Sequence, residues 1–267
     1  MNSIPESKLK TLRKVIKDKG SLAVAYSGGI DSTLISKIAF EQLGDRSMAV
    51  TIKSESYSKR ELEVAETVAA EIGIAHEVVA KSELQNNNYV QNPVNRCYFC
   101  KKSEMATLRQ VARKNGIEHV AFGVNMSDFG EHRPGLKALE EDEAFHPLVA
   151  ANLNKSEITA LAEHLGLSNH DLPSTTCLAS RIPYGQRITL EKLNQIEQAE
   201  ELLFKIGISQ SRVRNYGDMA RIEVPREEIS LLLEHRESII STMKQLGFSY
   251  ITLDLEGYRS GSMNEVL

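Results

Sequence analysis

Four short apolar runs alternate with amphipathic stretches over the first 165 residues of this 267-residue chain. The runs have the length of buried strands, and they are Leu22–Tyr26, Met48–Ile52, His76–Val79 and His119–Phe122. The stretches with helical spacing are 33–43, 59–72, 98–115 and 155–165. Strands that alternate with helices predict a parallel sheet with right-handed crossovers. Ligands of such α/β folds bind at the carboxyl ends of the strands.

The pattern changes near Ile188. A helical stretch at Leu190–Leu203 is followed by two β-like runs, Ser211–Asn215 and Met219–Val224, with a hairpin turn between them. A second helix is expected at Arg226–Gln245 and a last strand at Tyr250–Leu255. This order predicts a smaller α+β domain. We therefore expect two domains, at 1–187 and 188–267, the second serving substrate binding or oligomerisation.

The most informative local motif is Ser27–Thr33 (SGGIDST), which follows the first expected strand and opens the first helix. Gly28 and Gly29 allow a tight turn that brings backbone N–H groups close to a ligand. The hydroxyls of Ser27, Ser32 and Thr33 add donors, and a helix N-terminus favours an anion. Asp31 would repel a bare phosphate, so we interpret it as a ligand of the Mg²⁺ that accompanies ATP.

This motif does not have the glycine spacing of the dinucleotide-binding G-x-G-x-x-G, and it lacks the lysine of a Walker A loop. It resembles the S-G-G-x-D-S loop of the PP-loop ATP pyrophosphatases, which cleave ATP between the α and β phosphates. The resemblance implies an adenine nucleotide α-hydrolase-like fold for the first domain, in which the loop holds the pyrophosphate.

Cys97, Cys100 and Cys177 are the three cysteines. The first two form a C-x-x-C at a helix start, after the polar loop 85–96, and the third lies in a second polar loop, 168–186. An odd number of cysteines argues against a disulfide framework. Three thiolates suit a 4Fe–4S cluster with one open iron, and zinc, which usually takes four ligands, is the alternative occupant. Buried thiols that pack as small apolar groups are the plainest interpretation.

The net charge and the hydropathy of the chain limit the kinds of molecule that it is expected to bind. The formal net charge is −4, so no overall basic field would attract nucleic acid. The arginines nevertheless concentrate in the last third. Solvated surface charge is the plainer interpretation of any single arginine, and a cluster for one small anion is the alternative, because the guanidinium group suits phosphate and carboxylate. No apolar run is long enough to cross a bilayer, and no secretory signal is present in the N-terminal residues. We expect a cytoplasmic protein.

Four segments, distributed over both expected domains, carry a more specific resemblance. They are Asn125–Ala138 (NMSDFGEHRPGLKA), Cys177–Tyr184 (CLASRIPY), Arg212–Arg214 (RVR) and Gly257–Met263 (GYRSGSM). These segments resemble those of the LarE family, sulfur transferases that help to build the nickel-pincer nucleotide cofactor of lactate racemase. The resemblance implies an ATP-dependent enzyme that adenylates pyridinium-3,5-biscarboxylic acid mononucleotide and converts its carboxylates into thiocarboxylates. It also implies a homo-oligomer, since LarE proteins are hexamers.

The resemblance also implies roles for single residues. Cys177 matches the sulfur donor of single-cysteine members, which sacrifice a side-chain sulfur. With Cys97 and Cys100, however, this chain is similar to a three-cysteine variety, in which a 4Fe–4S cluster carries an exchangeable sulfide from an external source. Asp128 would join Asp31 at Mg²⁺, and Gly123 would let the nucleotide approach the fourth strand. The positions that match the family's substrate site are Ser180, Arg181, Glu200, Arg212, Arg214 and, for a phosphate, Arg259.

Interpretations in which these residues have no functional role, and three other functions, stay open at this point. Arg212 and Arg214 could alternate outward on a strand that faces water, and Glu200 could lie on an exposed helix face. A tRNA thiolation enzyme would also combine a PP-loop with three cysteines, although it would need several basic contacts to phosphates. An amidating PP-loop ligase would use ammonia and would need no thiols. A non-enzymatic metal-binding protein would leave the phosphate loop unexplained.

Overall fold

The computed structural model describes residues 5–129, 134–173 and 175–265. Its contacts divide the chain into two compact units, which we describe separately. The larger unit comprises Met1–Ser82 and Asn95–Thr175, and the smaller unit comprises Glu83–Val94 and Thr176–Leu267. Residues 83–94 and 176–187 thus group by contacts with the C-terminal elements. The domain boundary expected at residue 187 remains a prediction.

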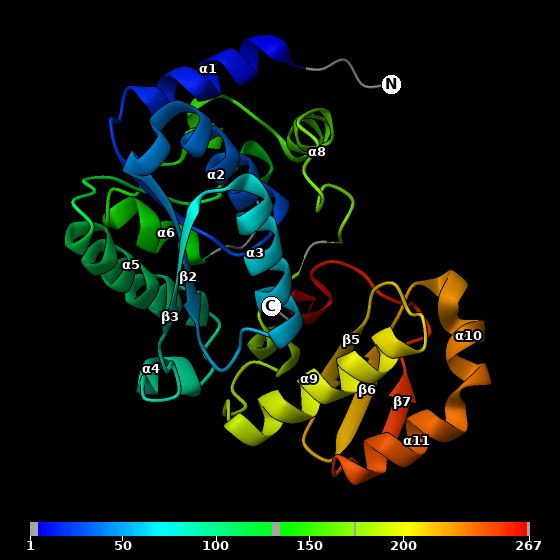
Figure 1. The fold of residues 1–267 in the computed structure, drawn as a ribbon. Helices are drawn as coiled ribbons and strands as arrows, with labels where there is room; N and C mark the ends of the chain where they lie inside the picture. Colours follow the sequence, from blue (N-terminus) through cyan, green and yellow to red (C-terminus); the bar gives the residue numbers. More distant parts are fainter. Residues whose placement is uncertain (1–4, 130–133, 174, 266–267) are drawn as a thin grey trace. The chain divides into compact units, whose positions relative to one another are not determined.

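A four-stranded parallel sheet forms the centre of the larger unit (Figure 1). Its order is β3-β2-β1-β4, with β1 at Leu22–Ala25, β2 at Ser47–Lys53, β3 at Ala75–Ala80 and β4 at Val120–Ala121. The predicted α/β class with a parallel sheet is confirmed. β4 is shorter than expected because the N–H of Phe122 donates to the carbonyl of Phe145 instead of to a neighbouring strand.

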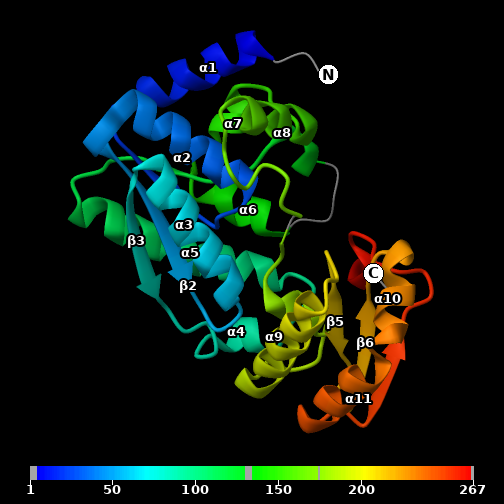
Figure 2. The ribbon, with the colours of Figure 1, turned by 45° about the vertical axis from the view of Figure 1, so that its right-hand side comes forward.

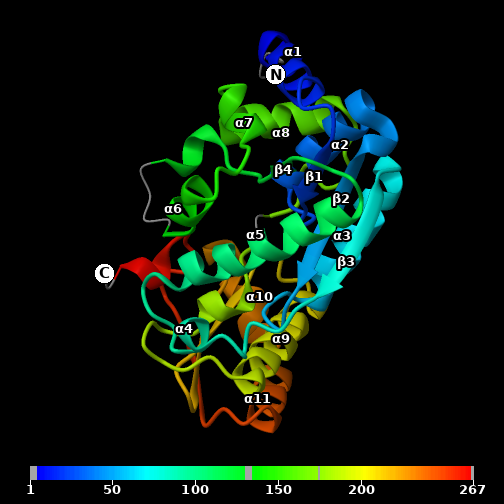
Figure 3. The same ribbon diagram turned by 90° about the vertical axis from the view of Figure 1, so that its left-hand side faces the viewer.

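Helices cover both faces of this sheet (Figure 3). One face carries α1 (Glu6–Lys17), α2 (Ile30–Leu43), α3 (Lys59–Ile72), α7 (Pro147–Ala150) and α8 (Lys155–His164). The other face carries α5 (Arg96–Lys114) and α6 (Pro134–Glu141). Side chains of β1 alternate between these two layers: Leu22 and Val24 pack under α2, whereas Ala23 and Ala25 pack under α5. Burial on both faces explains why the strands are apolar throughout.

The smaller unit contains a three-stranded mixed sheet and helices on one of its faces (Figure 2). Strand β5 (Arg212–Asn215) pairs antiparallel with β6 (Met219–Glu223), as predicted, and β6 pairs parallel with β7 (Tyr250–Leu253). The helices of this face are α9 (Leu190–Lys205), α10 (Ile229–Glu234) and α11 (Arg236–Gln245), and the unit also includes the short helix α4 (Asn87–Val90). Apolar residues of α9 and α11 pack on the sheet.

The single helix expected over Arg226–Gln245 is divided in the structure. A 3₁₀ turn at Arg226–Glu228 leads into α10, and His235, whose ψ of 13° is not helical, separates α10 from α11. Both helices contribute buried residues to one core, so packing rather than a proline or glycine sets the break. Within the described ranges, every helix is too short or too polar to span a membrane.

Candidate active site

The backbone of the phosphate loop turns sharply between β1 and α2. Gly28 has a φ of +71°, and a Cβ atom there would lie 3.0 Å from the backbone of Ala65 on α3. Gly29 is the N-cap residue of α2 and has an extended backbone. The phenol of Tyr57 donates a hydrogen bond of 2.9 Å to the carbonyl of Ser27. Only glycine fits position 28, since it combines a positive φ with close contact to another helix.

The hydroxyls of the loop hold it in shape from within. Ser32 Oγ donates to the Gly29 carbonyl over 3.0 Å and accepts from the Ser27 N–H over 3.2 Å. Thr33 is completely buried, and its Oγ1 accepts a hydrogen bond of 2.9 Å from Asn169 Nδ2. The same amide nitrogen donates to the Gly28 carbonyl over 2.7 Å. Ser32 and Thr33 therefore stabilise the loop in this state, and direct contacts of theirs with ATP remain predictions.

Asp31 and Asp128 both bind Asn125, which follows β4. Asn125 Nδ2 donates to Asp31 Oδ1 over 3.0 Å, and the Asn125 backbone N–H donates to Asp128 Oδ2 over 2.9 Å. The other oxygen of Asp31 accepts from the ammonium group of Lys155, at the start of α8. Asp128 is buried and caps the 3₁₀ helix at Met126–Asp128. The two expected Mg²⁺ ligands are thus held near one another by one asparagine.

Gly123 lies against the first turn of α2. A Cβ atom at this position would approach the Cβ of Asp31 and the backbone nitrogen of Ser32 to 3.2 Å in both cases. Such contacts are tighter than most real Cβ contacts. The glycine allows close packing of the β4 end against the phosphate loop, and the predicted approach of a nucleotide to this residue remains untested.

Cys97 and Cys100 lie in the first turns of α5, in the larger unit. Their i, i+3 spacing places both sulfurs on one side of the helix, and Cys97 is exposed whereas Cys100 is partly buried. Gly135 of α6 packs on this turn, since a Cβ there would lie 3.8 Å from the Cβ of Cys97. Burial lowers the pKa of the neighbouring Lys101, but Glu104 and the sulfurs of Cys100 and Cys97 outweigh it and raise that pKa.

Cys177 lies in the smaller unit, immediately before a 3₁₀ turn at Leu178–Arg181. Its carbonyl accepts hydrogen bonds from the Ser180 N–H over 2.9 Å and from Arg181 Nη1 over 3.0 Å. The same Nη1 donates to Thr176 Oγ1 over 2.8 Å and to Ser180 Oγ over 3.0 Å. The buried Arg181 guanidinium therefore fixes the backbone around Cys177 while the thiol itself stays partly exposed.

Glu200 of α9 anchors this arginine. Its two oxygens accept from Arg181 Nε and Nη2, each over 2.8 Å, and Oε1 also accepts from the Val213 N–H over 2.9 Å. Burial opposes ionisation, but the charges of Arg181 and Arg212 together with these hydrogen bonds lower the pKa of Glu200. The exposed-face interpretation of Glu200 is wrong, because the carboxylate is enclosed by its partners and only 15% exposed.

All four residues of β5 are buried, so the water-facing interpretation of its arginines is also wrong. Val213 packs into the core beneath α9, and Arg212 and Arg214 project from the opposite face. The Arg212 guanidinium lies 5.2 Å from the Tyr258 ring centre. Arg214 donates to Glu223 Oε2 over 2.6 Å, to Ser262 Oγ over 2.9 Å and to the Ser180 carbonyl over 3.2 Å. The register places Arg221 and Glu223 of β6 beside them.

We call these four side chains, Arg212, Arg214, Arg221 and Glu223, the arginine face. Arg259 lies outside it and forms ion pairs with Asp254, Glu256 and Glu265, which together raise its pKa. The Nε atom of Arg214 is buried and has no hydrogen-bond partner among the described residues. A buried donor of this kind is costly unless a ligand or water satisfies it.

Comparison with known proteins agrees with this arrangement. The asparagine synthase family model matches residues 10–94, which include the phosphate loop. The NH(3)-dependent NAD(+) synthetase of Chlorobaculum tepidum is 26% identical over 55% of this chain and 54% of its own length. An uncharacterized protein of Synechocystis is 43% identical over 98% of both chains. The pyridinium-3,5-bisthiocarboxylic acid mononucleotide synthase of Lactiplantibacillus plantarum is 37% identical over 98% of this chain and 95% of its own length.

This chain belongs to the LarE family. The similarity to the synthase extends through both units, whereas that to the ammonia-dependent enzyme covers about half the chain. The protein is therefore a LarE-type enzyme, a sulfur-transferring synthase with an ATP-using PP-loop, and the purely metal-binding interpretation is excluded.

The structure does not show the cysteine cluster expected of a three-cysteine LarE protein. Among the described residues, no group of three or more His, Cys, Asp or Glu side chains is gathered for a metal ion. Cys97 and Cys100 belong to the larger unit and Cys177 to the smaller one. Bound Mg²⁺ at Asp31 and Asp128 and an iron–sulfur cluster at the cysteines both remain proposals.

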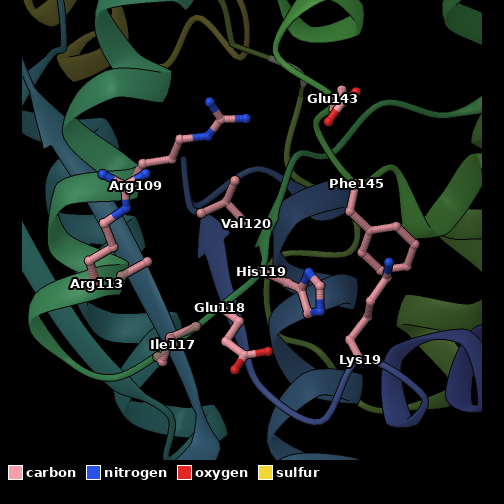
Figure 4. Close-up of a pocket in the computed structure, with 10 residues that line it drawn as sticks. Lys19, Arg109, Arg113, Ile117, Glu118, His119, Val120, Glu143 and Phe145 are labelled. Atoms are coloured by element: carbon pink, nitrogen blue, oxygen red, sulfur yellow. The ribbon is translucent and has the colours of Figure 1, made fainter.

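A pocket of about 150 Å³ opens at the amino ends of the strands in this LarE protein, whereas the phosphate loop follows the carboxyl end of β1 (Figure 4). It lies at the amino end of β4, and its walls include Lys19, Arg109, Arg113, His119 and Phe145. None of the site residues predicted from the sequence lines it. Its position away from the carboxyl ends of the strands makes it a poor candidate for the ATP site.

Sequence reasoning missed several residues at the phosphate loop and on the arginine face. Asn125 opens the Asn125–Ala138 segment, and its place in the loop after β4 could have identified its role at the phosphate loop. Lys155, Asn169 and Tyr57 reach the phosphate loop from distant segments, and Glu223 binds Arg214 across the sheet. No local motif marks these four residues, because only the fold brings them to their partners.

Proposed function

We propose that this protein adenylates the carboxylates of pyridinium-3,5-biscarboxylic acid mononucleotide and converts them into thiocarboxylates. The observation that carries the proposal is the 37% identity over nearly the full length of both chains to a synthase of the corresponding bisthiocarboxylic acid. The phosphate loop and the arginine face add two anion-binding features of the kinds that this reaction requires, one for ATP and one for a small anionic mononucleotide.

Activation has to come first, because a carboxylate carbon carries no leaving group and its negative charge repels nucleophiles. A carboxylate oxygen of the substrate attacks the α-phosphorus of ATP, and the bond to the β-phosphate oxygen breaks. The products are an acyl adenylate and pyrophosphate. Ser27–Thr33 would bind the departing phosphates with backbone N–H groups at the start of α2. Asp31 and Asp128 would hold Mg²⁺, which supplies positive charge to those phosphates.

The smaller unit would bind the substrate. Arg212 and Arg214 are buried beside compensating carboxylates, which keeps their guanidinium groups fixed in orientation. A guanidinium held in this way suits the phosphate or a carboxylate of the mononucleotide. The unpartnered Nε of Arg214 supports this role, since a ligand oxygen would satisfy it. Arg181 and Glu200 would position the loop that carries Cys177, next to Ser180.

Sulfur transfer follows by attack of a sulfur nucleophile on the carbonyl carbon of the acyl adenylate, with AMP as the leaving group. Cys97 and Cys100, at i, i+3 beside the Lys101 ammonium, have the donor type and local charge that suit a thiolate-held cluster. Together with Cys177 they would hold a 4Fe–4S cluster, which supplies sulfide on its open iron. The alternative is that Cys177 gives up its own sulfur and is left as dehydroalanine.

The test is a product analysis on protein purified without oxygen. With the pyridinium acid and ATP, AMP and pyrophosphate should form in step with thiocarboxylate, and ADP with inorganic phosphate would contradict the proposal. Iron, sulfide and zinc analysis of Cys97→Ala, Cys100→Ala and Cys177→Ala should show lower iron in each variant. If Cys97→Ala and Cys100→Ala transfer sulfur normally, and mass spectrometry finds dehydroalanine at position 177, the sacrificial route holds and the cluster proposal is wrong.

A further inference from the structure

Lys155 reaches the phosphate loop from a separate segment of the chain. It is the first residue of α8, a helix that packs against α2. The start of α8 is firmly held, since Asn154 and Glu157 form a capping box and the Lys155 N–H donates to Ser127 Oγ over 3.1 Å. The side chain is 42% exposed, and its ammonium group binds Asp31 Oδ2. The backbone is therefore fixed while the ammonium group has room to move.

We propose that Lys155 is a further residue of the ATP site, and that its ammonium group binds the β- and γ-phosphates and then the departing pyrophosphate. This inference rests on the proposed use of ATP. It concerns a residue of the chain that neither the loop motif nor the family motifs include, and it arises from the contact between Lys155 and Asp31.

The contact with Asp31 explains how the lysine would become available. Oδ1 of Asp31 is already bound by Asn125, and Oδ2 is bound by Lys155. A divalent cation on Asp31 would compete with the ammonium group for the same oxygen, because two cations on one carboxylate oxygen repel each other. The flexible four-carbon stem of lysine lets the charge turn to a nearby anion. Phosphate oxygens on the loop beside Asp31 are the anion that the site provides.

The chemical gain lies in the leaving group. Negative charge accumulates on the pyrophosphate as its bond to the α-phosphate breaks, and a positioned ammonium group stabilises that charge. The loop itself contributes N–H groups and hydroxyls but contains no basic side chain from Ser27 to Thr33. Lys155 supplies the positive charge that a Walker A loop obtains from its own lysine. Asp31 also lies in the first turn of α2, and the N-terminus of that helix favours an anion.

The experiment measures binding of pyrophosphate and of AMP by titration calorimetry, with Mg²⁺ present, for wild type, Lys155→Met and Lys155→Arg. Lys155→Met should weaken pyrophosphate binding by about tenfold or more, the loss expected for a charge-assisted hydrogen bond. AMP binding should not change, because AMP lacks the two outer phosphates. Lys155→Arg should recover most of the affinity. The matched control is Lys37→Met, since Lys37 pairs with Glu41 further along α2 over 3.6 Å.

A second set of titrations tests whether Lys155 exchanges Asp31 for a phosphate, and it uses a chelator in place of Mg²⁺. Asp31→Asn should bind pyrophosphate more tightly than wild type, because it removes a repulsive charge and frees Lys155. Most of that gain should vanish in the double variant Asp31→Asn with Lys155→Met, which makes the two residues a coupled pair. Equal pyrophosphate affinity of wild type and Lys155→Met, with normal wild-type binding, would overturn the role of Lys155 and leave ATP use intact. A wild-type protein that binds neither ATP nor pyrophosphate would overturn both.

Discussion

The phosphate loop and the arginine face both suit anions, yet they are built in opposite ways. The loop uses backbone N–H groups at a tight turn, and Gly28 and Gly29 make that turn possible. The arginine face uses guanidinium groups buried under neighbouring elements, with Glu223 and Ser262 from other parts of the smaller unit as partners. The anion-binding groups of the first lie within seven consecutive residues, which Asn169 and Tyr57 brace from distant segments, whereas the second is formed by pairs that lie far apart in the sequence.

This difference has an energetic consequence. A loop of backbone donors buries no formal charge, so loss of one side chain alters its shape but leaves no unpaired ion. In the smaller unit each buried charge depends on its partner, and removal of one partner leaves the other without compensation. We therefore expect substitutions there to reduce stability, and substitutions in the loop to reduce ligand binding first. The predictions below test that division.

The largest effect should come from Arg181→Met. It removes the guanidinium that Glu200 binds through both oxygens and that fixes the loop around Cys177. The free energy of unfolding should fall by about 3–5 kcal/mol, the usual loss when one member of a buried ion pair is removed. Urea unfolding measures it, with the exposed Arg187→Met as the control. Equal losses in the two variants would mean that the pair contributes little.

Asp31→Ala should show the opposite behaviour. Its side chain is 20% exposed and pairs with Lys155, which is itself 42% exposed, so the melting temperature should fall less than for Arg181→Met. Adenylation with the pyridinium acid should fall at least about 100-fold, or about 2.7 kcal/mol, because a ligand of the Mg²⁺ on the phosphates is lost. Release of pyrophosphate from ATP is the measurement. Asp45→Ala, in the 3₁₀ turn after α2, is a suitable control.

Gly28→Ala should combine the two behaviours, since it strains the loop against α3. The added methyl group would meet the Ala65 backbone at 3.0 Å with a φ of +71°. We expect a loss of about 1–3 kcal/mol in the free energy of unfolding together with weaker ATP binding. Gly116→Ala is the matched control, because Gly116 has a φ of +68° but open space around it. The excess of the first variant over the second measures the contact with α3.

The contrast between the two regions also explains what the sequence could predict. The strand–loop–helix order, the glycines and Asp31 follow one another in the chain, so pattern alone identifies the loop. The same patterns place β5 correctly but suggest that Arg212 and Arg214 face water. Their burial depends on Tyr258, Glu223 and Ser262, and the residue pattern of β5 does not predict these partners. Likewise, α10 and α11 separate at a histidine, because tertiary packing overrides helix propensity there.

Acid should lower the stability of the smaller unit by protonating Glu200. This loss of stability should be smaller than the loss caused by Arg181→Met. The pKa of Glu200 in the folded protein lies below its ordinary value of 4.5. Its ionised form therefore stabilises the fold above about 4.5, and that contribution is lost as the pH falls through the lowered folded-state pKa. Glu200→Gln should be less stable than wild type at pH 7, with the difference shrinking as the pH falls below 4.5. A constant difference from pH 7 to pH 3 would show that its charge contributes nothing.

The smallest effect should come from Tyr57→Phe, which removes one hydrogen bond to the loop. Burial and the nearby Glu61 raise the pKa of Tyr57, so its phenol keeps its proton and donates to the Ser27 carbonyl at any pH that the protein tolerates. Loss of that hydrogen bond should cost about 1 kcal/mol, roughly a fivefold rise in the dissociation constant of ATP, with no change at the arginine face. Tyr258→Phe provides the comparison, because it keeps the ring under Arg212. It should leave ATP binding unchanged, and equal losses of ATP affinity would mean that the loop and the arginine face are not independent.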